Sequence, residues 1–150
     1  MAAKSKRNAA IAAAVLAALL LCGCAEDEPH YEDRAFAETL DDGGIRALSL
    51  SPMIGYYMET TDGTPFFFSA EDSTEDAMVV GNLVARRAEI SFEAFTPGDK
   101  IVVWWYIIEE TYPSHIHIYD IELVKAGKKS DLPQAIQDEI ASLSDQITFE

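Results

Sequence analysis

Short apolar runs separated by turn residues dominate the pattern of hydrophobic and polar positions after residue 45. Residues 53–60 and 65–68 are rich in aromatic side chains, and Asp62-Gly63 lies between them. Because Asp-Gly is a strong hairpin signal, we expect these two runs to pair as antiparallel strands. The pattern therefore predicts a mainly β domain, either a barrel or a sandwich.

Two further runs extend this prediction. Residues 89–95 alternate between apolar and polar, which places Ile90, Phe92 and Ala94 on the buried face of a strand. The run 101–108 is apolar without a break, which predicts a central strand buried on both faces. A shorter apolar run covers 77–80.

The pattern changes near the C-terminus. A last strand is expected at 116–124, followed by an amphipathic helix over 131–145. Asp131 is the expected N-cap, with Gln134 three residues later. The apolar stripe that should pack on the sheet is Leu132, Ile136, Ile140 and Leu143.

The N-terminal segment has a different character. Lys4, Lys6 and Arg7 precede a thirteen-residue Ala- and Leu-rich stretch, 9–21, which is the order of a secretory signal peptide. A transmembrane helix needs about 20 apolar residues, so an uncleaved membrane anchor is the less favoured alternative.

The end of this segment, Leu21-Cys22-Gly23-Cys24, resembles the lipobox of bacterial lipoproteins. The resemblance implies removal of residues 1–23, a covalent lipid on Cys24, and an extracytoplasmic protein held at the membrane by that lipid. An acidic tether is then expected over 24–44 and the folded domain over 45–150. Cys22 leaves with the signal and Cys24 carries the lipid, so no disulfide is expected.

Charge narrows the range of partners. The chain has 11 basic and 26 acidic residues, and loss of the three basic residues of the signal takes the net charge from −15 to −18. Nucleic-acid affinity depends on Lys and Arg neutralising phosphates, so nucleic acid is excluded as a partner.

A second resemblance covers residues 53–124. Gly98-Asp99-Lys100, a strand, and then Glu110-Thr111-Tyr112-Pro113 are similar to a signature of small lipoprotein-borne bacterial domains of unknown function. Those domains resemble five-stranded OB-like barrels. The resemblance thus implies a small OB-like β-barrel, here with a C-terminal amphipathic helix, and it implies no activity.

The candidate ligand-binding residues are Trp104, Trp105, Glu110 and Tyr112. Consecutive strand residues face opposite sides, so the two indoles cannot enter one core layer. Either one of them is exposed and stacks on a sugar or peptide, or the C-terminal helix covers it. Glu110 and Tyr112 either line a shallow cleft or end the strand at Pro113.

His115 and His117 are the candidate metal ligands. Residues two apart on a strand share a face, and Glu109 or Glu110 is a possible third ligand for zinc. The acidic stretch 71–76 offers oxygen ligands for calcium but lacks EF-hand spacing. Both groups are better explained as polar surface, so we expect no metal or other cofactor.

The sequence contains no nucleophile elbow, phosphate-binding glycine loop or redox cysteine pair, and we expect no enzyme. The favoured prediction is a non-enzymatic module of the cell envelope that binds an envelope protein, a peptide or a glycan. A zinc- or calcium-binding lipoprotein and a purely structural envelope protein are the alternatives.

Overall fold

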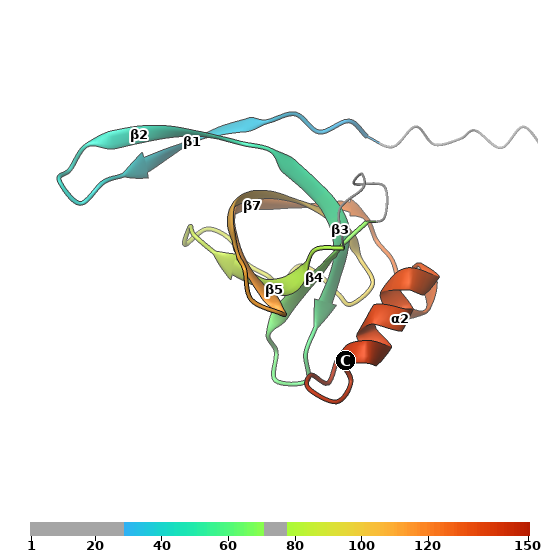
Figure 1. Ribbon diagram of the computed structural model, residues 1–150. Coiled ribbons are helices and arrows are strands. Elements are labelled where there is room, and N and C mark those ends of the chain that lie inside the picture. Colours follow the sequence, from blue (N-terminus) through green and yellow to red (C-terminus); the bar gives the residue numbers. More distant parts are fainter. Residues whose placement is uncertain (1–28, 71–77) are drawn as a thin grey trace, which may run out of the picture. The chain divides into compact units, whose positions relative to one another are not determined.

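The computed structural model describes residues 29–70 and 78–150, and its folded unit runs from Tyr31 to Glu150. Five strands form a sheet that closes into a ring (Figure 1). In chain order they are β3 (Pro52–Glu59), β4 (Pro65–Ser69), β5 (Val80–Ala85), β6 (Lys100–Glu109) and β7 (Ser114–Lys125). Around the ring the order is β3-β4-β5-β7-β6, and β6 pairs with β3 to close it.

The pairing confirms most of the predicted strands. The apolar runs that begin at residues 53, 65, 101 and 116 all lie in strands, and β3 and β4 pair as an antiparallel hairpin. β5 and β7 are parallel, whereas the other neighbours in the ring are antiparallel. The protein is therefore mainly β.

The interior of the ring holds one apolar cluster to which every strand of the ring contributes. Its buried members are Tyr57, Phe67, Leu83, Ile101, Val103, Ile116 and Ile118. Side chains alternate along β6, so Val102 and Trp104 lie on its outer face in a separate cluster. Burial of β6 on both faces, predicted from its unbroken apolarity, is confirmed for Ile101–Trp104, whereas Ile107 near the end of the strand is exposed.

The strand predicted at 89–95 is wrong. The residues between β5 and β6 form turns, in which the Ile90 amide donates to the Arg87 carbonyl at 3.3 Å and the Phe95 amide to the Phe92 carbonyl at 3.1 Å. Ile90 and Phe92 still pack against the interior cluster, whereas Ala94 is exposed. The alternating pattern thus reflects which side chains of a loop are buried against the ring interior, and it does not indicate a strand.

A second, two-stranded sheet precedes the ring. β1 (Arg34–Thr39) and β2 (Ile45–Leu50) pair in continuous antiparallel register. The segment 34–44 was predicted as part of a tether, so the fold begins earlier than expected. The Asp41-Asp42-Gly43-Gly44 stretch is the hairpin turn, with Gly43 at φ +82° and its amide donating to the Leu40 carbonyl at 2.9 Å.

The β1–β2 hairpin packs on the outer face of β6 and β7. Phe36 and Leu48 lie against the buried cluster that contains Trp104 and Tyr119. Arg34 forms ion pairs of 2.7 Å with both Asp120 and Glu122 of β7. The hairpin is therefore held by apolar burial and by charge.

The C-terminal helix α2 (Gln134–Leu143) lies against the outer face of β3 and β4 (Figure 1). The predicted apolar stripe makes this contact, against Met58, Phe66 and Phe68. The helix is shorter than 131–145, and Asp131 is not its N-cap. Asp131 ends the 3₁₀ turn η1 (Lys129–Asp131), and Pro133 occupies the cap position. Proline has no side-chain oxygen, so no side-chain hydrogen bond caps the helix.

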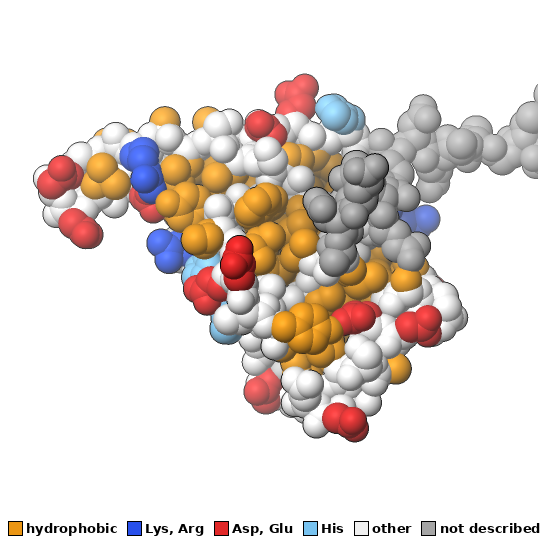
Figure 2. All heavy atoms as spheres, viewed as in Figure 1, with side chains coloured by type: hydrophobic (Ala, Val, Ile, Leu, Met, Phe, Trp, Pro, Cys, Tyr) orange, Lys and Arg blue, Asp and Glu red, His pale blue; other side chains and the backbone are white. Residues whose placement is uncertain are grey.

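Carboxylates are spread around the face of the molecule drawn in Figure 2, with a hydrophobic area between them. No helix within residues 29–70 and 78–150 combines the length and apolarity that a membrane crossing demands.

Candidate functional site: a polar hollow beside the β3–β4 turn

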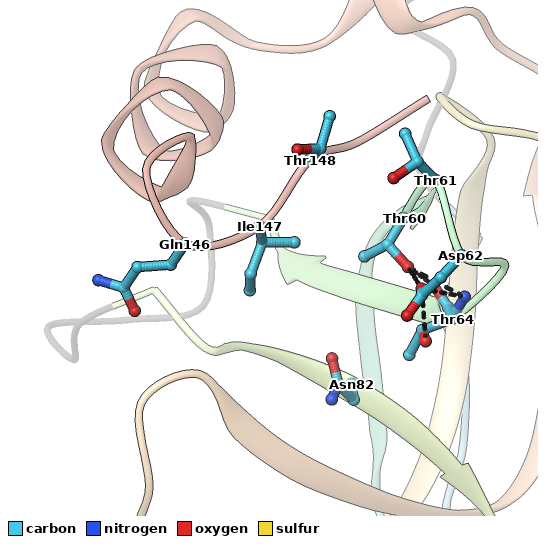
Figure 3. A pocket seen from close by; sticks show the side chains of 8 residues that line it. All are labelled: Thr60, Thr61, Asp62, Thr64, Asn82, Gln146, Ile147 and Thr148. Carbon is cyan, nitrogen blue, oxygen red and sulfur yellow. Dashed lines mark hydrogen bonds between the residues drawn. The ribbon is translucent and has the colours of Figure 1, made fainter.

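A hollow of about 270 Å³ lies where three distant segments meet (Figure 3). The β3–β4 turn supplies Thr60, Thr61, Asp62 and Thr64, and β5 supplies Asn82. The segment after α2 supplies Gln146, Ile147 and Thr148. Seven of these eight lining residues are polar, so the hollow suits a polar ligand better than an apolar one.

The turn is fixed by hydrogen bonds among its own side chains. Gly63 adopts φ +82°, which a glycine takes without strain, and its amide donates to the Thr60 carbonyl at 2.8 Å. Asp62 Oδ1 accepts the hydroxyls of Thr60 and of Thr64, the latter at 2.9 Å. The Thr60 and Thr64 hydrogen bonds lower the pKa of Asp62, so its carboxylate stays charged at the rim.

The opposite wall is the C-terminal segment, which pairs with the turn through its backbone. The Thr61 amide donates to the Thr148 carbonyl and the Glu150 amide to the Glu59 carbonyl, each at 2.9 Å. Phe149 anchors this segment, with its ring centroid 5.0 Å from that of Phe66. Both walls of the hollow are thus tied to the ring.

Several polar side chains in the hollow have no protein partner. Among the residues that the structure describes, no hydrogen bond engages the side chains of Thr61, Asn82, Gln146 and Thr148. Together they present two hydroxyls and two carboxamides, which both donate and accept. This arrangement suits a neutral ligand rich in hydroxyl or amide groups.

Sequence analysis did not identify this site. The Asp62-Gly63 pair predicted a hairpin turn but did not indicate a binding site. Thr60, Asn82 and Thr148 lie far apart in the sequence and come together only through the strand pairing and the return of the C-terminal segment.

The predicted ligand residue Trp104 is fully buried. Its Nε1 donates to the Glu32 carbonyl at 3.0 Å, and the Arg34 guanidinium lies 3.5 Å from its ring centroid. Tyr31 meets it edge to face at 5.9 Å. The covering element is therefore the chain leading into β1, not the C-terminal helix, and the indole face is unavailable for stacking in this arrangement.

The other predicted ligand residues do not join Trp104. Trp105 is partly buried and packs against the interior cluster, on the opposite face of β6. Glu110 and Tyr112 are exposed in the β6–β7 loop. Tyr112 donates a hydrogen bond to Glu139 of α2, which raises the pKa of Tyr112. This loop is thereby connected to the helix.

The two candidate metal ligands meet Glu109, as their placement on one strand face predicted. Glu109 Oε1 lies 2.8 Å from His117 Nε2, and Oε2 lies 3.2 Å from His115 Nδ1. The hydrogen bond with His117 lowers the pKa of Glu109, with a further contribution from His115.

No metal centre is recognisable in the described ranges, 29–70 and 78–150: none of their groups of three or more His, Cys, Asp or Glu side chains is arranged to hold a metal ion. The acidic stretch 71–76 considered for calcium and the lipidation candidate Cys24 lie outside the described residues.

Charged groups also surround the hairpin. Glu38 of β1 accepts a hydrogen bond from the Tyr119 hydroxyl at 2.9 Å and pairs with Arg46 of β2. The Tyr119 bond, followed by Arg46, lowers the pKa of Glu38. Because the charged form is favoured, Glu38 keeps its contacts to a lower pH than a free glutamate would.

Comparison of the chain with protein-family models, with curated proteins and with solved structures finds no match.

Proposed function

We propose that this chain is an exported, lipid-anchored protein of the cell envelope whose folded unit is a non-enzymatic binding module. Its ligand is small, neutral and polar, such as a sugar or a short peptide. The observation that carries the proposal is the polar hollow, whose wall presents Thr61, Asn82, Gln146 and Thr148 without protein partners.

The proposal includes an OB-like barrel. Counted along the chain, the ring strands follow the order one-two-three-five-four, with the third and fifth parallel. OB-fold proteins bind ligands on their second and third strands and in the loop between the first and second. The hollow lies at the corresponding turn, Thr60–Thr64, and beside Asn82 of the third strand, which supports a ligand at this position.

Size limits the ligand. A hollow of about 270 Å³ is just below the range of typical small-molecule sites, about 300–1,000 Å³. It suits one sugar ring or a dipeptide. At about 0.3 kcal/mol per non-hydrogen atom, a ligand of roughly 15 such atoms gains about 4.5 kcal/mol, which corresponds to a dissociation constant of about 0.5 mM.

Asn82→Ala tests the hollow with N-acetylglucosamine as the probe, because that sugar carries both hydroxyl and amide groups. We expect wild-type protein to bind it and the variant to bind about tenfold more weakly, since one or more hydrogen bonds of roughly 1 kcal/mol each are lost. Isothermal titration calorimetry measures both affinities.

The matched control is Gln134→Ala, which removes an exposed carboxamide that bonds to Asp138 along α2, outside the hollow. It should bind like wild type. Equal affinity of all three proteins would place the sugar elsewhere and contradict the proposal for this hollow.

The anchor is tested on protein extracted from membranes of the producing cell. We expect an intact mass that begins at Cys24 and includes a diacylglyceryl group, and we expect Cys24→Ser to leave the membrane fraction. An unmodified chain that starts at Met1 would show that the anchor proposal is wrong.

Metal binding and a purely structural role stay predictions from the sequence. Calorimetric titration with Zn²⁺, with Glu109→Gln as the comparison, tests the first of them. Saturable heat in wild type that the variant loses would favour a metal-binding function at His115 and His117 over the sugar or peptide ligand.

A further inference from the structure

We propose that β1 pairs edge to edge with β1 of a second copy of this chain, which gives a dimer with twofold symmetry. The starting point is that β1 pairs only with β2 among the strands of the described residues. Its other edge makes no backbone hydrogen bond within that part of the chain. An unpaired edge of six residues is a template for another strand.

The backbone groups that point away from β2 can be identified from the hairpin turn. The Leu40 amide donates to the Gly44 carbonyl at 2.8 Å, so this is a hydrogen-bonded pair. Such pairs alternate in an antiparallel ladder, and even-numbered residues of β1 therefore bond to β2. Ala35, Ala37 and Thr39 direct their amide and carbonyl groups toward the free edge.

Two of the usual devices that protect an edge, a proline and a β-bulge, are absent from β1. Its sequence, Arg-Ala-Phe-Ala-Glu-Thr, contains no proline or lysine, and its register with β2 has no bulge. The residues on its outer side, Ala35, Ala37 and Thr39, are small and exposed. The outer face of β1 therefore places no bulky side chain in the way of a second strand.

The charged residues of β1 indicate that its partner is a second copy of β1. Antiparallel pairing about Phe36 places Arg34 opposite Glu38 of the second copy, and Glu38 opposite its Arg34. Phe36 faces itself. These are non-hydrogen-bonded positions, where opposite side chains come closest. Arg34 also pairs with Asp120 and Glu122 of its own chain, and Glu38 pairs with Arg46, so the contacts across the dimer extend existing ion pairs. The spacing of Arg34 and Glu38 about Phe36 thus makes the edge self-complementary.

The other strand of the hairpin provides a comparison. β2 also has no second neighbouring strand in the described part of the fold, but its sequence, Ile-Arg-Ala-Leu-Ser-Leu, carries one charge and no opposite charge to match it. Symmetric pairing of β2 therefore gains no ion pair. This difference selects β1 as the dimer edge.

The outer face of the hairpin adds no repulsion. Its residues are all uncharged, although the whole chain has a net charge of −15. By register they are Ala35, Ala37, Thr39, Ile45, Ala47 and Ser49. Two copies can thus meet here despite their overall like charge. The dimer does not depend on the lipid anchor or on the hollow.

Disulfide trapping tests the register of β1 against β1 of the second copy. The full chain carries Cys22→Ser and Cys24→Ser, so that the introduced cysteines are its only thiols. Ala35→Cys and Ala37→Cys are made in separate, differently tagged chains and mixed. Opposite Cα atoms of a hydrogen-bonded pair are about 5.5 Å apart, within disulfide reach. The control is a mixture of Ala47→Cys and Ser49→Cys chains, whose introduced thiols lie on the same face of the hairpin but on β2. We expect the mixed disulfide between the β1 variants to form severalfold faster than the one between these β2 variants. Equal rates would overturn the register.

Charge exchange tests the pairing independently. Sedimentation velocity should show concentration-dependent dimers for wild type and monomers for Arg34→Glu or Glu38→Lys alone, because each variant sets like charges opposite each other twice. An equimolar mixture of the two variants should regain dimers, since both contacts then join opposite charges. Mixing cannot repair a folding defect. Wild type that stays monomeric at millimolar concentration would overturn the proposal. So would a monomeric mixture of variants in which amide hydrogen exchange shows that β1 is still paired with β2.

Discussion

Gly98→Ala should lower the free energy of unfolding by at least about 3 kcal/mol, although the substitution only adds a methyl group. Gly98 adopts φ +101°, and an added Cβ would lie 2.1 Å from the carbonyl carbon of Lys128 and 2.4 Å from the amide nitrogen of Lys129. Both neighbours are backbone atoms, so no side-chain rotation relieves the contact.

The surroundings of Gly98 explain why the contact cannot open cheaply. The Gly98 amide donates to the Tyr57 carbonyl at 2.9 Å, which fixes the turn to β3. Next to it, buried Asp99 accepts the Gly127 amide at 3.0 Å and the Thr96 amide at 2.9 Å. The Gly127 bond joins the turn to the segment that contains Lys128 and Lys129, so moving the two segments apart would break it.

Gly43→Ala is the matched control, because Gly43 also has a positive φ, +82°, but nothing lies within 4 Å of the added Cβ. Its cost should be about 1 kcal/mol, the backbone strain alone. Urea unfolding followed by circular dichroism gives both values. Equal losses for the two variants would show that the close approach at Gly98 is not part of the folded state.

Trp104→Ala should destabilise the protein by about 4 kcal/mol, as expected when a fully buried aromatic side chain is truncated. The variant also loses the hydrogen bond to the Glu32 carbonyl and the stacking partner of Arg34. We therefore expect the chain at 31–34 to detach from β6 before the ring unfolds. Amide hydrogen exchange of residues 31–39 measures that detachment, and urea unfolding measures the total loss.

Tyr112→Ala is the comparison for Trp104→Ala, since both residues were predicted to bind ligand. Tyr112 is 62% exposed, and its truncation should change the free energy of unfolding by no more than about 0.5 kcal/mol. A small effect at both positions would contradict the structural role assigned to Trp104.

Local patterns were sufficient for the strands whose burial is regular. The unbroken run in β6 predicted burial on both faces, and Ile101 and Trp104 do lie in different clusters. The rule that residues two apart share a face correctly grouped His115 with His117, and their neighbour across the β6–β7 pairing is Glu109. These features depend on the strand period and on adjacent strands alone.

Local patterns failed where distant segments determine the outcome. Alternation at 89–95 records which side chains face the core, but a strand also needs a neighbouring edge, and that segment bonds only within its own turns. Trp104 is covered by Glu32, 72 residues earlier. The hollow joins residues 60–64, 82 and 146–148, and no local signal encodes their meeting.

The central claim, that the polar hollow binds ligand, is tested most directly by NMR screening of ¹⁵N-labelled protein against a library of neutral sugars, polyols and small amides. Such a screen locates a site before its natural ligand is known. We predict that amide shifts of Thr60–Thr64, Asn82 and residues 146–148 move together and saturably. A library that produces no shifts, or shifts confined to other surfaces, would contradict the account.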